Sequence, residues 1–136
     1  MSDPAALLAF AELHKLEPGA SRRAAISRAY YAAFHALQPC LDLLVSPDEV
    51  GKYGCARHSA VLKYLRTWSA VHPDKSMAMR HGADAIKCYH LMVACQEARE
   101  QSDYQLGAAG ELSASEAVNI VGKASRVLKY AGSFSR

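Results

Sequence analysis

The residues best suited to acid–base and phosphate chemistry are two histidines, one arginine and the residues that follow that arginine. His35 and His58 carry imidazoles, which can take up or release a proton near neutral pH. Arg99 carries a guanidinium, which can hold a phosphate through paired hydrogen bonds. Asp103 and Tyr104 lie four and five residues beyond Arg99. These five residues are the candidates for a catalytic role.

Arg99 and Asp103 have two interpretations, because residues four apart lie side by side on a helix. One is a structural ion pair at a helix end, which stabilises an exposed helix by only about 0.3 kcal/mol. The other is a cleft in which Arg99 and Tyr104 face a ligand or RNA. We favour the structural interpretation and keep the cleft as the functional hypothesis.

Arg28 and His35 form a second arginine–histidine pair. Seven residues make nearly two helical turns, so both side chains lie on one helix face, about 10.5 Å apart along the axis. We predict that they tie helices together through buried hydrogen bonds, with Tyr30 and Tyr31 packed beside them. The alternative is a polar patch that faces a nucleotide.

His58 lies at the start of a predicted helix, where it either makes a packing contact or faces the same groove as His35 and Tyr104. The other histidines lack the spacing and the partners of a metal site; they are His14, His72, His81 and His90. We therefore expect neither a metal nor a cofactor. The cysteines form no C-x-x-C pair, which favours small buried thiols in a reducing compartment; they are Cys40, Cys55, Cys88 and Cys95.

The net charge of +3 and the pI of about 8.7 permit contact with nucleic acid without the strong basic footprint of a dedicated binder. Six cations could form a basic surface along the second and third helices, or an ordinary solvated face; they are Arg22, Arg23, Arg28, Arg57, Lys63 and Arg66. Charge alone does not decide between these interpretations.

The 136 residues are 51% apolar, which is enough for one continuous core, so we predict a single domain over residues 1–136. The N-terminus lacks the positive charge of a signal peptide, and no apolar stretch approaches the ~20 residues of a membrane span. We therefore expect a cytoplasmic protein without membrane contact.

Apolar spacings of three and four predict five helices, at about 4–16, 21–45, 56–70, 76–106 and 114–131. Asp3-Pro4 and the capping box of Ser113 and Glu116 mark two helix starts, and Pro39 is a candidate kink. The fourth helix places a mainly apolar set on one side: Met79, Ala83, Ile86, Tyr89, Val93 and Gln96. No strand pattern is present, so we expect an all-α, four- to five-helix, up-and-down antiparallel bundle.

Four stretches, taken together over about 21–131, resemble the HEPN family of small prokaryotic helical modules found in toxin–antitoxin and phage-defence loci. The most specific is S-R-A-Y-Y-A-x-F-H, from Ser27 to His35. The others are 57–61, 99–104 and the amphipathic C-terminal helix. Their order and spacing add weight to the first.

The resemblance implies a helical bundle that commonly dimerises and, in active members, a metal-independent RNase with an R-x(4–6)-H motif near the end of the fourth helix. There the imidazole moves a proton while the guanidinium holds the charge that grows on phosphorus. In this chain Asp103 stands where the histidine is expected after Arg99. A carboxyl with an ordinary pKa of ~3.9 is a poor acid at neutral pH, so the resemblance is to the branch without the RNase histidine.

The leading hypothesis is a HEPN-like module of a prokaryotic defence or toxin–antitoxin system. It would bind RNA, nucleotide or a partner protein through a dimeric groove carrying Arg28, Arg57, Arg99 and Tyr104. The resemblance implies a homodimer, with a nucleotidyltransferase antitoxin or another defence subunit as partner. One alternative is a metal-independent endoribonuclease toxin that uses His35 or His58 in place of the missing histidine, and another is a non-enzymatic interaction scaffold.

Overall fold

The computed structural model describes residues 3–104 and 112–134, which form five α-helices and one short 3-10 helix. Their bounds are α1 Pro4–His14, α2 Ala20–Leu41, η1 Pro47–Glu49, α3 His58–Val71, α4 Lys75–Tyr104 and α5 Ala114–Phe134. Among these residues there is no strand, and the backbones of Val50 and Ala56 form an isolated bridge. The prediction of an all-α bundle is confirmed for the described residues.

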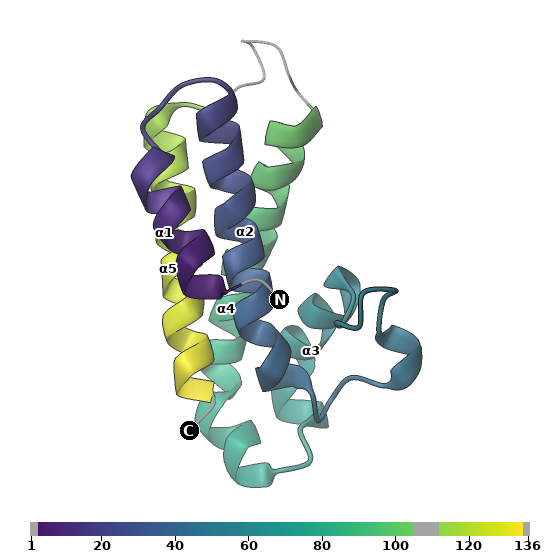
Figure 1. The fold of residues 1–136 in the computed structure, drawn as a ribbon. Helices are drawn as coiled ribbons and strands as arrows, with labels where there is room; N and C mark the ends of the chain where they lie inside the picture. Colours follow the sequence, from purple (N-terminus) through teal and green to yellow (C-terminus); the bar gives the residue numbers. More distant parts are fainter. Residues whose placement is uncertain (1–2, 105–111, 135–136) are drawn as a thin grey trace.

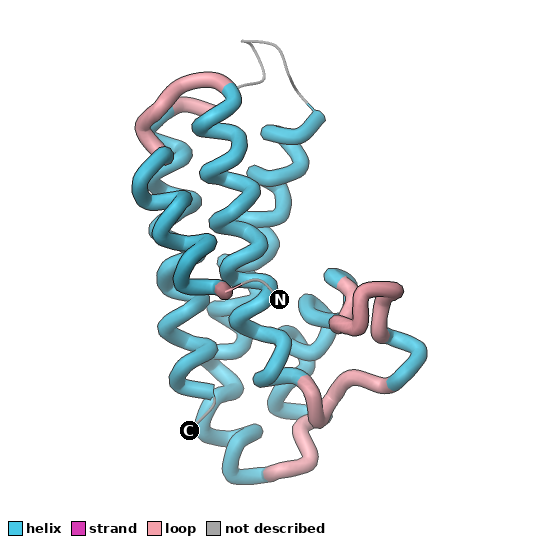
Figure 2. The backbone as a smooth tube through the Cα atoms, viewed as in Figure 1, coloured by secondary structure: helices cyan, strands magenta, loops and turns pink. Residues whose placement is uncertain are grey.

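The long helices α2, α4 and α5 pack side by side, and α1 covers α2 and α5 (Figure 1). In that view α2 and α5 run downward while α1 and α4 run upward. The pairs α1–α2, α2–α4 and α4–α5 are therefore antiparallel, whereas the packed pair α2–α5 is parallel. The shorter α3 packs mainly on α4 and stands apart from the other helices. The loop between α2 and α3 projects on the α3 side of the bundle (Figure 2).

The helix starts follow the signals in the sequence. The Asp3 carboxylate accepts a hydrogen bond from the backbone N–H of Ala5 at 3.0 Å, just before Pro4. Ser113 and Glu116 exchange side-chain and backbone hydrogen bonds at 3.1 and 3.0 Å, as the capping box predicts. The predicted C-terminal end of α2, at about residue 45, was too late. The helix includes Pro39 and ends at Leu41.

One core cluster takes side chains from all five helices. Apolar side chains of α2 and α3 supply its largest fully buried members, which include Ile26, Tyr30, Leu37, Leu65 and Trp68. On α5, Val121 and Val127 are fully buried, whereas Val118 is 40% exposed. The buried side chains supply most of the hydrophobic stabilisation, because each removes a large apolar surface from water.

The stripe predicted for the fourth helix is not its packing face. Met79 is 87% exposed and Ile86 is 47% exposed. The buried face of α4 is a different one, with several small side chains; it comprises Ala78, His81, Ala85, Cys88, Leu91, Met92, Cys95, Ala98 and Ser102. Because α4 packs against α2, α3 and α5, small residues are needed where three helices approach it.

The cysteines of α4 agree with the prediction of buried thiols. Cys88 and Cys95 are fully buried, and none of the four cysteines is in a disulfide bond. Burial raises the pKa of Cys88, and it raises the pKa of Cys95 to about 12. Both thiols therefore stay protonated at neutral pH.

Within 3–104 and 112–134, none of the helices combines the length and the apolar character needed to cross a membrane.

Candidate functional site

Residues from three helices converge where α2 faces the start of α3 and the end of α4. We call this group the Arg99 site; it comprises Tyr30, Tyr31, Phe34 and His35 from α2, His58 from α3, and Arg99 and Asp103 from α4. The site brings together four of the five candidates for a catalytic role.

The guanidinium of Arg99 lies over two tyrosine rings. Its central carbon is 5.2 Å from the ring centre of Tyr30 and 5.7 Å from that of Tyr31. One terminal nitrogen bonds Asp103 at 2.9 Å, which is the predicted i, i+4 ion pair. The Arg99 side chain is 17% exposed, and its Nε is buried without a hydrogen-bond partner among the described residues. The aromatic faces thus provide the main surroundings of a largely desolvated cation.

The imidazole of His58 is held from two directions. Its Nδ1 shares a hydrogen bond with the hydroxyl of Tyr30. Its ring stacks on Phe34 with 4.2 Å between ring centres. This arrangement leaves Nε2 as the nitrogen that can exchange a proton or a hydrogen bond with a ligand.

Burial and the nearby charge of Arg99 lower the pKa of His58 below its ordinary value of 6.5. Burial raises the pKa of Tyr30, so its hydroxyl keeps its proton at neutral pH. At neutral pH the imidazole of His58 and the phenol of Tyr30 are therefore neutral, and the charges of the site are those of the Arg99–Asp103 ion pair.

His35 lies at the edge of the Arg99 site. Its ring is 6.2 Å from that of Tyr31 and 5.4 Å from that of Phe34, between ring centres. Burial lowers its pKa as well. A second neutral imidazole thus lies on the side of the site that faces the loop between α2 and α3.

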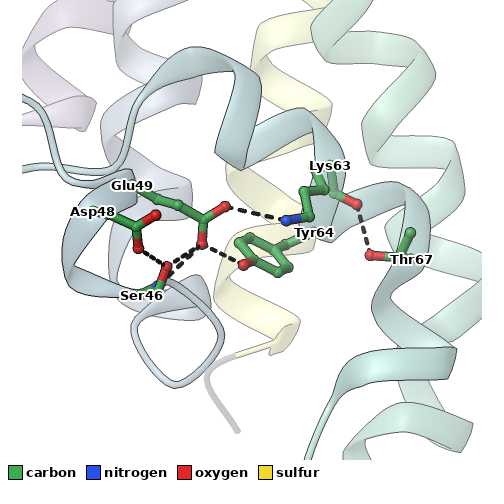
Figure 3. Close-up of polar contacts among 6 residues, drawn as sticks. All are labelled: Ser46, Asp48, Glu49, Lys63, Tyr64 and Thr67. Atoms are coloured by element: carbon green, nitrogen blue, oxygen red, sulfur yellow. Dashed lines mark hydrogen bonds and ion pairs between the residues drawn. The ribbon is translucent and has the colours of Figure 1, made fainter.

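The loop before α3 is fixed by Glu49, as Figure 3 shows. The Glu49 carboxylate accepts hydrogen bonds from the hydroxyl of Tyr64 and from the backbone N–H of Ser46 at 3.1 Å, and it pairs with Lys63 at 3.3 Å. The bond from Tyr64, followed by those from Ser46, lowers the pKa of Glu49 to about 2. The carboxylate therefore stays charged and pins η1 to α3.

The residues directly before His58 are held by two further contacts. The backbone N–H of Arg57 donates to the backbone oxygen of Glu49 at 3.0 Å. The backbone N–H of Ala56 donates to the side-chain oxygen of Gln38 on α2 at 2.9 Å. Because α2 and η1 both hold this segment, His58 is presented to Tyr30 from a fixed backbone.

Two other predicted residues lie elsewhere, and one is only partly described. Arg28 is exposed and its guanidinium lies 5.7 Å from the ring centre of Phe10 on α1, so the predicted buried tie with His35 is wrong. The prediction failed because the Arg28 side chain lies against α1, whereas His35 packs against Tyr31 and Phe34 in the Arg99 site. Arg57 is exposed at the N-cap of α3. Tyr104 ends α4, and its side chain lies outside the described residues.

The predicted basic surface is partly used for internal contacts. Arg22 donates to the backbone oxygens of Leu112 at 3.0 Å and Leu16 at 3.3 Å, which ties the start of α2 to α5 and to the end of α1. Lys63 pairs with Glu49. Because Arg22 and Lys63 make contacts within the fold, they are less available to bind a ligand at the surface.

Sequence reasoning missed the role of the tyrosine pair as the surroundings of Arg99. The signal was their adjacency, because two neighbouring helical residues point in directions about 100° apart and cannot both face the centre of the core. Tyr30 is 1% exposed, whereas Tyr31 is only half-buried. Both rings still lie within 5.7 Å of the Arg99 guanidinium, which packs against them from α4.

No three potential metal ligands gather in the part of the chain that the structure describes. Comparisons with protein-family models, with curated proteins and with solved structures found no match.

Proposed function

We propose that this chain is a HEPN-like helical module that binds single-stranded RNA at the Arg99 site. The observation that carries the proposal is the position of the Arg99 guanidinium, which is largely desolvated, stacked over Tyr30 and Tyr31, and close to His58. The resemblance of Ser27 to His35 to the HEPN signature supports the same function.

The chemistry of the site suits a nucleotide. A guanidinium has five N–H donors, and Asp103 takes one, which leaves others for a phosphate oxygen. Tyr31 and His35 are half-buried rings on which an unpaired base can stack. Low water content around Arg99 strengthens its attraction for a phosphate.

The direct test is the affinity for a labelled single-stranded RNA, measured by fluorescence anisotropy. Arg99→Ala should weaken binding roughly 10- to 150-fold, the loss of about 1.5–3 kcal/mol for one charge-assisted hydrogen bond. Arg126→Ala, which removes one exposed arginine from α5, is the matched control and should change affinity little. Circular dichroism should show the same helix content in both variants. Equal affinities for Arg99→Ala and Arg126→Ala would contradict the proposal.

A second candidate is a metal-independent endoribonuclease, and the position of His58 beside Arg99 favours it. In the tautomer whose Nδ1–H donates to Tyr30, Nε2 can take the proton of a ribose 2′-hydroxyl. The 2′-oxygen then attacks the adjacent phosphorus, and Arg99 holds the charge that develops there. The 5′-oxygen leaves with a proton from water, which gives a 2′,3′-cyclic phosphate and a 5′-hydroxyl.

Incubation of the purified protein with total RNA in EDTA separates the two candidates. Cleavage that His58→Gln abolishes and Asp103→Asn preserves would establish the enzyme. If the wild type binds RNA without cleaving it, Asp103→His should introduce metal-independent cleavage near neutral pH, because it restores the imidazole four residues after Arg99. RNA binding without cleavage by the wild type or by Asp103→His would leave binding as the function.

We further propose that the chain forms a homodimer through the outward side of α4. Met79, Ala83 and Ile86 are exposed on that helix, and such an apolar stripe favours a partner surface. Light scattering should show a dimer for the wild type and a monomer for Ile86→Glu, whereas Val118→Glu on α5 is the control. A wild type that stays monomeric at high micromolar concentration would contradict self-association.

A further inference from the structure

A cavity lies directly beside the Arg99 site, between the start of α1, the C-terminal half of α2 and the loop that leads to α3. Its volume is about 730 Å³, within the range of roughly 300–1,000 Å³ that ligand pockets span. Its chemically distinctive lining residues are His35, Asp42, Tyr53 and Cys55. Of these four residues, only His35 belongs to the site candidates of the sequence, and the fold brings the other three beside it.

The loop wall of this cavity is held in place by hydrogen bonds within the loop and to α2. The backbone N–H of Gly51 donates to the backbone oxygen of Cys55 at 2.8 Å, and that of Gly54 donates to Gly51 at 3.1 Å. Gly54 has a φ of +80°, a conformation that glycine adopts without strain. The amide of Gln38 fastens Ala56, the end of the wall, to α2.

The cavity and the Arg99 site share one residue, His35. His35 lines the cavity and also packs against Tyr31 and Phe34 of the site. Arg57, which directly follows the lining residue Ala56, is exposed at the same end of the loop. A chain of nucleotides held at Arg99 can therefore place its next base in the cavity while Arg57 lies near its backbone.

The one carboxylate of the lining disfavours a phosphate there and favours a neutral group with hydrogen-bond donors. Asp42 carries the only formal charge among the described lining residues, because burial lowers the pKa of His35 and keeps it neutral. Most of the other lining side chains are apolar. Tyr53 is 85% exposed, and the Lys52 ammonium lies 5.1 Å from its ring centre. The lining thus offers a flat aromatic surface and one carboxylate acceptor.

We propose that this cavity binds one unpaired guanine base of the RNA held at the Arg99 site, an inference that rests on the proposed RNA-binding function. A carboxylate only accepts hydrogen bonds. Guanine presents two adjacent donors, its ring N1–H and its 2-amino group, which match the two oxygens of Asp42. Adenine and cytosine place an acceptor beside their amino group, and uracil flanks its one N–H with two carbonyl oxygens. Tyr53 stacks on the base at the cavity rim.

The test compares four labelled oligonucleotides by fluorescence anisotropy: a uridine tract and the same tract with one central guanosine, inosine or adenosine. Inosine is guanosine without the 2-amino group. The wild-type chain should bind the guanosine oligonucleotide roughly tenfold more tightly than the inosine one, the effect of one hydrogen bond to a charged group. Equal affinity for all four would overturn the inference.

Two variants locate the discrimination in the cavity. Asp42→Asn should remove the preference for guanosine over inosine and leave the affinity for the uridine tract unchanged, whereas Asp84→Asn on α4, the matched loss of one carboxylate, should keep that preference. Tyr53→Ala should weaken the guanosine complex at least fivefold, the low end of losing one stacked base, again with the uridine tract unaffected. A guanosine preference that survives both Asp42→Asn and Tyr53→Ala would place the base elsewhere and overturn the inference.

These outcomes are distinguishable from failure of the proposed function. If Arg99→Ala weakens the binding of all four oligonucleotides equally and the wild type shows no base preference, RNA binding stands and the guanine site fails. If the wild type binds none of the four, the proposed function fails and the guanine site fails with it.

Discussion

Two clusters among the described residues combine histidines with three aromatic rings, and only one of them also contains a cation. The Arg99 site combines the rings of α2 with His58 and a cation. The second group, which we call the Trp68 cluster, joins α3, α4 and α5 at the opposite end of α4; it comprises Trp68, His72, His81, Tyr130 and Phe134. In the Trp68 cluster the ring centres of Trp68 and Phe134 are 5.1 Å apart.

The two groups differ in what their polar atoms contact. In the Trp68 cluster, Trp68 donates to the backbone oxygen of Met77 at 2.9 Å, and Nδ1 of His72 accepts from the backbone of Asp74 at 3.1 Å. Trp68 is 1% exposed and His81 is 5% exposed. The Arg99 site instead keeps a cation and two imidazoles within reach of a ligand. The Arg99 site thus differs from the Trp68 cluster by its cation and by the partial exposure of His35 and His58, the two features on which the proposed function rests.

The largest expected effect is on the free energy of unfolding, and it comes from a substitution in the Trp68 cluster. Trp68→Ala should lower the free energy of unfolding by about 3–5 kcal/mol, because it leaves a large cavity in the core. Trp68→Ala protein that remains folded should bind RNA with the same affinity as the wild type. Urea unfolding measures the first quantity and anisotropy the second, and a loss of RNA affinity by folded Trp68→Ala would erase the distinction between the two groups.

A smaller effect concerns the buried imidazole of the Trp68 cluster. Nε2 of His81 is buried without a hydrogen-bond partner among the described residues. His81→Leu should therefore stabilise the fold by about 1 kcal/mol, because it removes an unsatisfied polar atom. His58→Leu should not stabilise it, since this variant breaks the hydrogen bond with Tyr30. Chemical denaturation of the two variants side by side checks the contrast, and stabilisation by both would refute it.

The pH dependence of stability should carry the signature of the Arg99 site. The pKa of His58 lies below its ordinary value of 6.5 in the folded chain. As the pH falls through that value, the unfolded chain takes up a proton that the folded chain does not, so stability should fall. Above the ordinary pKa the effect is absent.

Urea midpoints measured at about pH 8 and about pH 5.5, on either side of the ordinary imidazole pKa, should show this loss. His58→Gln should reduce the loss without abolishing it, because the pKa of His35 is shifted in the same direction. An unchanged pH dependence in His58→Gln would show that His58 does not contribute.

The smallest expected effect is that of Asp103→Ala. The i, i+4 ion pair with Arg99 is partly exposed, so its loss should lower stability by only about 0.3–0.5 kcal/mol. RNA affinity should stay the same or increase, because a negative charge leaves the phosphate site. A large fall in affinity, measured by anisotropy, would mean that Asp103 positions Arg99 rather than competes with the phosphate.

The sequence predicted the fold well because helix periodicity is a local property. The apolar spacing of α5 and the capping box of Ser113 and Glu116 located that helix within a few residues. The packing face of α4 could not be found in this way. Its large apolar residues Met79 and Ile86 lie outside, while small residues such as Ala85 and Cys88 permit the close approach of neighbouring helices. The size of the side chains, rather than their hydrophobicity, therefore determines which face of α4 packs against its neighbours.

The candidate site was predicted in part. The pair of Arg99 and Asp103 follows from helical spacing alone, and it is formed. The contact of His58 with Tyr30 joins residues 28 positions apart, so it depends on how α3 is placed by Glu49 and Gln38. Nothing in the local sequence encodes that placement.

The most direct test of the central claim is a titration of the chain with single-stranded RNA, followed through the imidazole ring signals of His58 and His81 by NMR, with the two signals assigned through His58→Gln and His81→Leu. If the Arg99 site binds RNA and the Trp68 cluster is structural, the His58 signals should shift in proportion to the RNA bound while the His81 signals stay unchanged. Arg99→Ala should suppress the His58 shift. An unchanged His58 under conditions in which the chain binds RNA, or equal shifts at both histidines, would contradict the account.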